Sequence, residues 1–534
     1  MRGWPLLCGV AVLALPMPAS AQQSRPRITP HIEASQVLTA DLQSGDVLTY
    51  STLGAGVDVS VQSRRVRVQL DYNYQHRFGY GDRLSDSDVH SGLGRAEIDV
   101  ARGVRFDASA LATRTRADIR GAAPTLLVGD ADNITQIYSV DLGPSVESAI
   151  GPVRIDASYL LGYTHADSPG VAGIAGQPAI DYFGNSTRQS FAASATTRPG
   201  RMLPVGITIS GSVNREDASQ LDQRYLGRNI GGELLWPFVR TVALVAGAGY
   251  EEIRVSQRDP VTDALGNPVI GDDGRFVTAP GSPRRTAYAT DNPLYWNAGL
   301  IWRPSHRTEL EARIGRRYDS WSYTGSFTHE IGEGSGIRIA VYDGIQSFGR
   351  QLGGALDSLP TRFGTEADTF SNNYNGCVFG TAGNAVGGCL NGALQSLAAA
   401  NYRARGVDGV IAFNRGQTRL GLGLGYTHRR FFAPQDAAGG ATIDGVTDRS
   451  YYVQAFAARA LSPVSSLTGN LYANYFDGGP GTATPVWSAG ANAAYARSFG
   501  RLAASLSAGL FTYQRDGADM DISVQALLGL GYDF

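Results

Sequence analysis

Hydrophobic and polar residues alternate one by one along most of the chain. Residues 66–75 place valine, leucine and tyrosine on one face and arginine, glutamine, aspartate and asparagine on the other. The same alternation recurs in residues 53–62, 153–164, 487–495 and 522–534. A side-chain period of two is that of a β-strand. The pattern therefore predicts an all-β protein whose strands have one apolar and one polar face.

The predicted connections between strands are mostly short and long in turn. The short ones are residues 101–103, 151–152, 304–307, 414–416, 462–464 and 499–501, and the long ones are 79–89, 114–133, 166–186, 256–291, 349–401 and 432–447. Soluble β-sandwiches also alternate, but turns of two such lengths are typical of outer-membrane barrels. We therefore expect a transmembrane antiparallel up-and-down β-barrel with short periplasmic turns and long extracellular loops. The strand count is about 22 (range 18–22), because alternation is weak near residues 134–150, 323–331 and 402–413.

Aromatic residues of the apolar faces sort by strand direction. On strands predicted to run outward they lie near the far end, at Tyr72, Tyr74, Tyr163, Tyr250, Tyr426 and Tyr475. On strands predicted to run inward they lie near the periplasmic end, at Trp236, Trp302, Tyr495, Tyr532 and Phe534. Amphipathic rings prefer the membrane–water boundary, so this sorting predicts two aromatic girdles.

Both ends of the chain carry signals for the cell envelope. Residues 1–21 contain Arg2, a short apolar stretch and an Ala19-Ser20-Ala21 cleavage site, which predict a signal peptide removed on secretion. Gly529, Tyr532 and Phe534 fit the terminal motif of outer-membrane barrels, which is read by the barrel-assembly machinery; Leu527 occupies a position that is usually polar. Residues 22–534 are therefore expected to form a barrel in the outer membrane of a Gram-negative cell, in contact with its lipid.

A barrel of about 22 strands encloses a wide lumen, and the sequence bears on what fills it. Barrels of 22 strands commonly hold a plug, but only residues 22–27 precede the first predicted strand. We expect no plug domain, which argues against a TonB-dependent receptor. The lumen is then filled with water or occluded by loops, and the predicted extracellular loop at 349–401 is long enough to fold inward.

Charged residues follow one another on the polar faces of three consecutive strands near the periplasmic mouth. If residues 101–103 form a tight turn that pairs Val100 with Val104, Asp99 faces Arg105. Opposite charges across strands stabilise a sheet by about 0.2–1 kcal/mol per pair. The set forms either a stabilising ladder on the wall or a mixed-charge constriction that filters solutes; its members are Arg67, Arg95, Glu97, Asp99, Arg105 and Asp107.

Cys377 and Cys389 are the only cysteines after the signal peptide, and both lie in the longest loop. Disulfides persist outside the cytosol, and a bridge here would stabilise the loop by about 3 kcal/mol. We predict a disulfide rather than a metal site or free thiols. Residues 390–400, rich in alanine and leucine, could form a short helix after it.

Other motifs give little chemistry. His76, His90, His165 and His428 map to the outer rim, as interface residues rather than metal ligands, and the acidic loops match no calcium-binding spacing. We predict no cofactor. The sequence lacks G-x-S-x-G and H-E-x-x-H, so an enzyme is not expected. Its near-neutral charge of -2 gives no reason to expect nucleic acid as a partner.

One stretch resembles a known family. It reads Gly299-Leu-Ile-Trp302-Arg303-Pro304-Ser305-His-Arg307-Thr308-Glu-Leu310-Glu-Ala312 and runs through a strand, a tight turn and the next strand. It is similar to a motif of the barrel family encoded near exopolysaccharide and PEP-CTERM sorting loci. The resemblance implies an envelope or polysaccharide context and no catalytic residue.

Two functions follow as expectations. The first is a channel, porin-like for small solutes or a conduit for an envelope or exopolysaccharide-related polymer. The second is a non-conducting barrel whose outer loops bind surface polymers or partners. A hydrolase at the barrel rim is a weaker alternative.

Overall fold

Strands dominate the computed structural model, which describes residues 26–80, 86–116, 134–167, 183–201, 203–364, 370, 374, 376–381, 386–394, 397, 399–434, 443–478 and 484–534. The long strands in the first half are β1 (Arg27–Asp41), β2 (Val47–Gln62), β3 (Val66–Gly79), β4 (Ser87–Ala101), β5 (Val104–Arg116), β6 (Ile134–Ile150), β7 (Val153–Asp167), β8 (Asn185–Thr197), β9 (Gly206–Ala218), β10 (Gln223–Val239) and β11 (Val242–Arg258). Those in the second half are β13 (Leu294–Ser305), β14 (Thr308–Arg317), β15 (Ser320–Gly332), β16 (Ser335–Gln346), β20 (Tyr402–Arg415), β21 (Thr418–Phe431), β22 (Thr447–Ser462), β23 (Ser465–Gly478), β24 (Val486–Phe499), β25 (Leu502–Arg515) and β26 (Asp521–Asp533).

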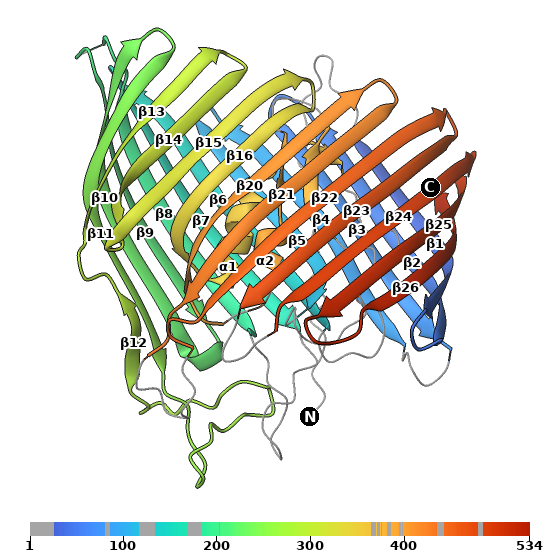
Figure 1. Ribbon diagram of the computed structural model, residues 1–534. Coiled ribbons are helices and arrows are strands. Elements are labelled where there is room, and N and C mark those ends of the chain that lie inside the picture. The colour runs from blue at the N-terminus through green and yellow to red at the C-terminus, as the bar shows by residue number, and fades with distance from the viewer. Residues whose placement is uncertain are drawn as a thin grey trace.

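These strands form one closed sheet (Figure 1). Each pairs antiparallel with its neighbours in the chain, and β26 returns to β1, where Tyr532 lies opposite Ile32. The ring has 22 strands, which confirms the predicted count. The segments of weak alternation became β6, β15 and β20. The short strand β12 (Arg284–Ala289) pairs only with β11 and extends the wall beyond the ring.

The two ends of the ring differ. Short turns lie at the top of Figure 1, and the β11–β12 extension reaches out at the bottom. At the bottom end residues 259–283 form two successive short hairpins, one with a bridge between Thr262 and Pro268 and one with a bridge between Ile270 and Phe276. No helix among the described residues is long and apolar enough to cross a membrane. The predicted signal peptide, and the prediction that no plug domain precedes β1, concern residues outside the described part of the chain and stay predictions.

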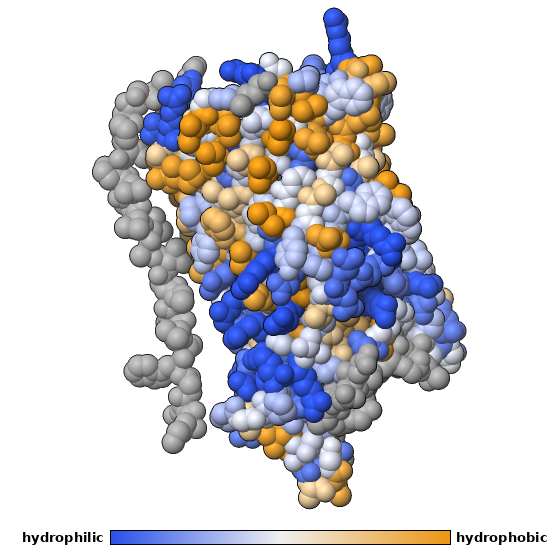
Figure 2. Space-filling model, turned by 90° about the vertical axis from the view of Figure 1, so that its left-hand side faces the viewer, coloured by the Kyte–Doolittle hydropathy of each residue, from blue (hydrophilic) through white to orange (hydrophobic). Residues whose placement is uncertain are grey.

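Large apolar side chains are exposed on the outside of the ring. Ile209, Ile230 and Leu528 are each about 60% exposed although they lie in the middle of strands. Figure 2 shows apolar residues gathered on the half nearer the short turns of this face, as part of an apolar belt, with a strongly polar zone below them. Girdle residues of the long-loop end contact one another from strand to strand: the ring centroids of Tyr426 and Tyr451 are 4.8 Å apart. Such a belt is suited to lipid.

The lumen contains its own small structure. The chain leaves β16 and forms α1 (Phe348–Asp357), β17 (Phe363–Gly364), β18 (Cys377–Gly380), β19 (Gly387–Cys389) and α2 (Asn391–Leu394) before it enters β20. The apolar side chains of α1 form a buried cluster with inward-facing residues of the wall; the cluster includes Leu93, Leu111, Ile137, Phe348, Leu352 and Leu356. Thus the described parts of residues 348–400, predicted as an extracellular loop, lie within the barrel (Figure 1).

Candidate functional site

The inward segment, by which we mean the described part of residues 347–401, contacts opposite walls of the barrel. On one side, the Gln62 and Gln69 side chains donate to the backbone oxygens of Thr361 and Phe363. On the other, the Asn414 amide donates to the oxygen of Gly380 over 3.3 Å. Gln62 and Asn414 lie at the short-turn ends of their strands. The segment therefore extends through the lumen to its far end.

A buried ion pair holds the start of α1. Ser347 caps the helix, since its hydroxyl accepts from the Arg350 backbone N–H over 3.1 Å. The Arg350 guanidinium lies 2.9 Å from the Glu216 carboxylate of β9, and these side chains are 9% and 3% exposed. Arg350 also donates to Asn401 over 3.0 Å and stacks on the Tyr225 ring. One arginine thus joins the beginning of the segment, its end and the wall.

The end of α1 is held by a second group of charges. Asp357 lies 3.9 Å from Arg95 and 3.8 Å from Arg188, and its carboxylate accepts from Ser109 over 3.2 Å. Burial raises the pKa of Asp357, and the two arginines oppose this rise. Because the docked carboxyl binds its proton more readily than a solvated one, docking through Asp357 weakens as pH rises through this pKa. Mild acid therefore does not release α1 through this group.

The predicted charge ladder is divided between two roles. Asp99 faces Arg105 at 3.0 Å, although a bulge pairs Ala101, not Val100, with Val104. Arg67 contacts both Glu97 at 2.8 Å and Asp99 at 3.8 Å. Farther along the wall, Arg95 lies 3.8 Å from Asp107 and donates to the Asp357 backbone oxygen over 3.1 Å. Arg95 therefore positions the inward segment, whereas Asp99 and Arg105 line open space near the short turns.

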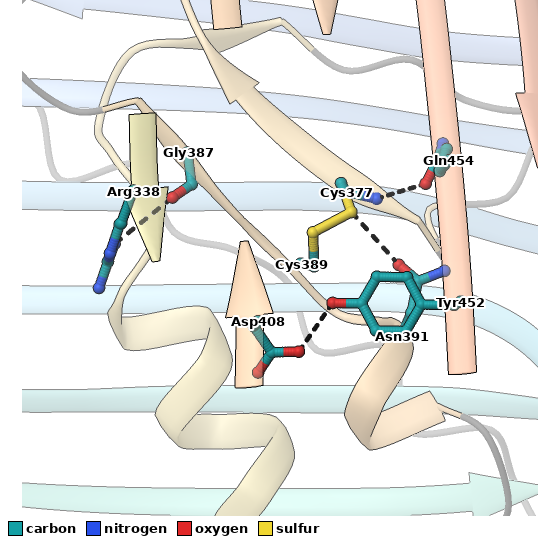
Figure 3. Close-up of a disulfide and its surroundings, with 8 residues drawn as sticks. All are labelled: Arg338, Cys377, Gly387, Cys389, Asn391, Asp408, Tyr452 and Gln454. Carbon is teal, nitrogen blue, oxygen red and sulfur yellow. Dashed lines mark hydrogen bonds between the residues drawn. A yellow bond between two sulfur atoms is a disulfide. The ribbon is translucent and has the colours of Figure 1, made fainter. Parts of the chain in front are cut away.

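Cys377 and Cys389 form a disulfide, with 2.00 Å between the sulfurs, inside the lumen (Figure 3). They are register partners in the β18–β19 hairpin. The Cys377 backbone N–H donates to the Gln454 side chain of β22 over 2.7 Å. A Cβ on Gly423 of β21 would come 2.2 Å from the Cys377 sulfur. The disulfide therefore packs against the wall at a position where a side chain would collide with it.

Replacing both cysteines by serine should loosen this hairpin without weakening the barrel. The chain-entropy model gives a loss of about 3 kcal/mol, confined to the segment because the ring contains neither cysteine. We expect faster hydrogen exchange over residues 377–389 and an unchanged thermal transition of the strands. An equal fall in the stability of both would contradict this assignment.

The described residues enclose three cavities within the barrel, and the inward segment lines two of them. One of about 340 Å³ lies between α1, β16 and the β18–β19 hairpin. One of about 560 Å³ lies between α1 and the wall, and one of about 1290 Å³ lies near the short turns. Ser212 and Asn229 line the two larger cavities, which therefore lie next to each other along β9 and β10.

Charged and aromatic side chains line the cavity of about 560 Å³ between α1 and the wall. Arg317 of β14 donates through two nitrogens to Glu251 of β11. Arg188 pairs with Asp141, and Tyr225 and Tyr318 present rings to the same space. Nearly every charge has an opposite partner, so the lining is polar but balanced. Such a surface suits small polar or charged solutes better than apolar ones.

Sequence reasoning missed most of this lining. Arg188, Glu251 and Arg317 were not singled out, because their partners lie on strands that are not adjacent in the sheet or in the inward segment. The rim histidines do not gather: Tyr138 lies between His90 and His165, with ring centroids 5.9 and 6.5 Å away. The described residues contain no group of three or more histidine, cysteine, aspartate and glutamate side chains placed to hold a metal.

Neither a known protein family nor a curated protein matches the sequence. Among solved structures, the match to the FrpB iron transporter from Neisseria meningitidis has 11% identity and a TM-score of 0.44, over 95% of this chain and 82% of that one. The match to the ferric-catecholate import receptor Fiu from E. coli K12 has 11% identity and a TM-score of 0.44, and it covers 96% of this chain and 82% of that one. The match to OccAB4 from Acinetobacter baumannii has 9% identity and a TM-score of 0.29, and it covers 96% of this chain and 99% of that one. Likeness at this level carries no argument about activity.

The class of the protein follows from its own geometry. A closed antiparallel ring leaves no backbone edge unpaired, as a membrane requires. Its outside has an apolar belt, and its inside has ion pairs and polar cavities. These features define a transmembrane β-barrel, the architecture of outer-membrane proteins.

Proposed function

We propose that the protein is a channel for small polar or charged solutes, narrowed by its own inward segment. The two adjacent polar cavities, which share Ser212 and Asn229 as lining residues, are the observation that carries this proposal. Paired charges along them compensate a solute for lost water without holding it tightly, as conduction requires.

The alternatives are less well supported. A conduit for an exopolysaccharide-related polymer needs a wide continuous bore, whereas the inward segment contacts opposite walls of the barrel and packs against the inner face of the wall. A non-conducting barrel that binds partners through its outer loops gives no role to the two adjacent polar cavities in the lumen. A rim hydrolase lacks a supporting nucleophile and base in the lining described above, so we propose no enzymatic activity and no cofactor.

Single-channel recording in planar bilayers tests the proposal. We expect Ser212→Trp to lower conductance severalfold, because an indole at the shared position obstructs both cavities. Thr468→Trp on β23 is the matched control, since Thr468 lines neither cavity. A silent wild-type barrel that is correctly folded would contradict the channel. Equal conductance in both variants would contradict this route.

A further inference from the structure

A shallow apolar groove lies on the outside of the barrel across β8 to β11. Its volume is about 350 Å³, and Phe191, Val213, Ile230 and Tyr250 form its walls. These four side chains are 49%, 46%, 60% and 43% exposed. At one level across the strands, Ala193, Gly211, Ile230 and Tyr250 are successive register partners. The small residues Ala193 and Gly211 therefore form the floor, and larger ones form the sides.

Arginines gather where the groove meets the polar zone. Arg228 lines the groove and lies opposite both Val213 and Glu252, one step beyond the Tyr250 girdle toward the long loops. It is exposed and makes no hydrogen bond or ion pair with any residue that the structure describes. Farther out, Leu226 has Arg215 and Arg254 as its two register partners.

The cluster has a positive excess. Its carboxylates are Asp217, which pairs with Arg215 and Arg224, and Glu252, which lies 3.5 Å from Arg254. Exposed pairs of this kind are weak, so their arginines can exchange partners. Four arginines thus face two carboxylates, and Arg228 is left to bind an anion. Figure 2 shows a strongly hydrophilic zone directly below the apolar belt on this side of the molecule.

We propose that this surface binds one lipid with a phosphorylated head group from the outer leaflet. An acyl chain lies in the groove over Gly211, and the phosphate contacts Arg228, with Arg215 and Arg254 nearby. Guanidinium groups bind phosphate through paired charge-assisted hydrogen bonds, and the Tyr250 girdle sets the groove at acyl depth and Arg228 at head-group depth. This inference is independent of solute passage through the lumen.

Native mass spectrometry of the delipidated full-length barrel in detergent tests it, with phosphatidic acid and a diacylglycerol of the same chains as probes. We expect one phosphatidic acid to be retained and the diacylglycerol to be lost at the same activation. Arg228→Ala should weaken phosphatidic acid binding by about tenfold or more, the size of one charge-assisted hydrogen bond. Gly211→Leu should weaken it comparably by filling the groove, since the new Cβ would meet only the Asn229 oxygen, at 3.4 Å.

Two matched variants should bind as the wild type does. Arg459 is exposed at the opposite membrane boundary, where it too has no hydrogen bond or ion pair among the described residues, and Arg459→Ala controls for loss of a charge. Gly469 lies between the exposed Leu467 and Leu471 with its nearest contact at 3.5 Å, and Gly469→Leu controls for added bulk. The proposal is overturned if Arg228→Ala and Gly211→Leu bind like these controls, if the diacylglycerol binds equally well, or if inorganic phosphate alone displaces the lipid.

Discussion

A barrel without its inward segment should conduct severalfold more current than the wild type and lose its preference among solutes. Gln346 of β16 and Tyr402 of β20 are register partners, so residues 347–401 can be replaced by Asn-Gly, a favoured two-residue hairpin turn. The ring retains all its strand pairings, while a lumen of 22-strand width opens. Planar-bilayer conductance and solute flux into liposomes measure the result.

The matched control shortens a loop that lies beyond the ring. The Val261 backbone N–H donates to the Val277 oxygen, so residues 262–276 can be replaced by the same Asn-Gly turn. This variant should conduct like the wild type. If the large deletion also leaves conductance unchanged while the barrel stays folded, the segment does not set the width of the passage.

The outer wall was predictable from sequence because lipid and water impose a local rule. Each residue of a spanning strand faces one or the other, so alternation is visible within ten residues. Girdle aromatics such as Tyr250 and Trp236 also indicated in which direction each strand crosses the membrane. The rule weakens where the inner face contacts protein instead of water, and there the pattern carries traces of the inward segment.

Some inner-face residues of the wall reflect contact with the inward segment. On β21, Gly421 and Gly423 occupy the inner face and leave room for the Phe379 ring and the Cys377 sulfur of the inward segment. Leu527, unusual at its position in the terminal motif, packs in a buried cluster with Phe370 and Phe511. Glycine and leucine on a face that should be polar thus indicate a protein-filled lumen. The length of residues 349–401 made them the candidate for filling the lumen, but no local pattern identified them.

The helix α1 shows why the site was missed. Ser347 followed by apolar residues at positions 348, 352 and 356 is a helix start with one apolar face. Gly349, Gly353 and Gly354 in the same stretch argue against a helix by propensity. Burial against the wall outweighs that cost, and burial depends on contacts between residues more than 200 positions apart.

The Glu216→Ala variant should free the start of the inward segment. Removing one partner of a buried ion pair costs about 3–5 kcal/mol, because the other charge is left in a poorly solvated site. Among the described residues, the Arg350 guanidinium then keeps Asn401, the Ile345 backbone oxygen of β16 and the Tyr225 ring as partners. We expect hydrogen exchange over residues 347–357 to accelerate about a hundredfold or more, with noisier single-channel currents.

The neighbouring carboxylate provides the control. Asp217 points outward, is 36% exposed and pairs with Arg215 and Arg224, so Asp217→Ala should cost at most about 1 kcal/mol and leave α1 protected. Replacing the whole buried pair, with Glu216→Leu and Arg350→Met together, should restore much of the protection that Glu216→Ala loses, since no charge is left buried. Equal protection in Glu216→Ala and the wild type would show that α1 is held by its apolar face alone, and that the ion pair only orients its first turn.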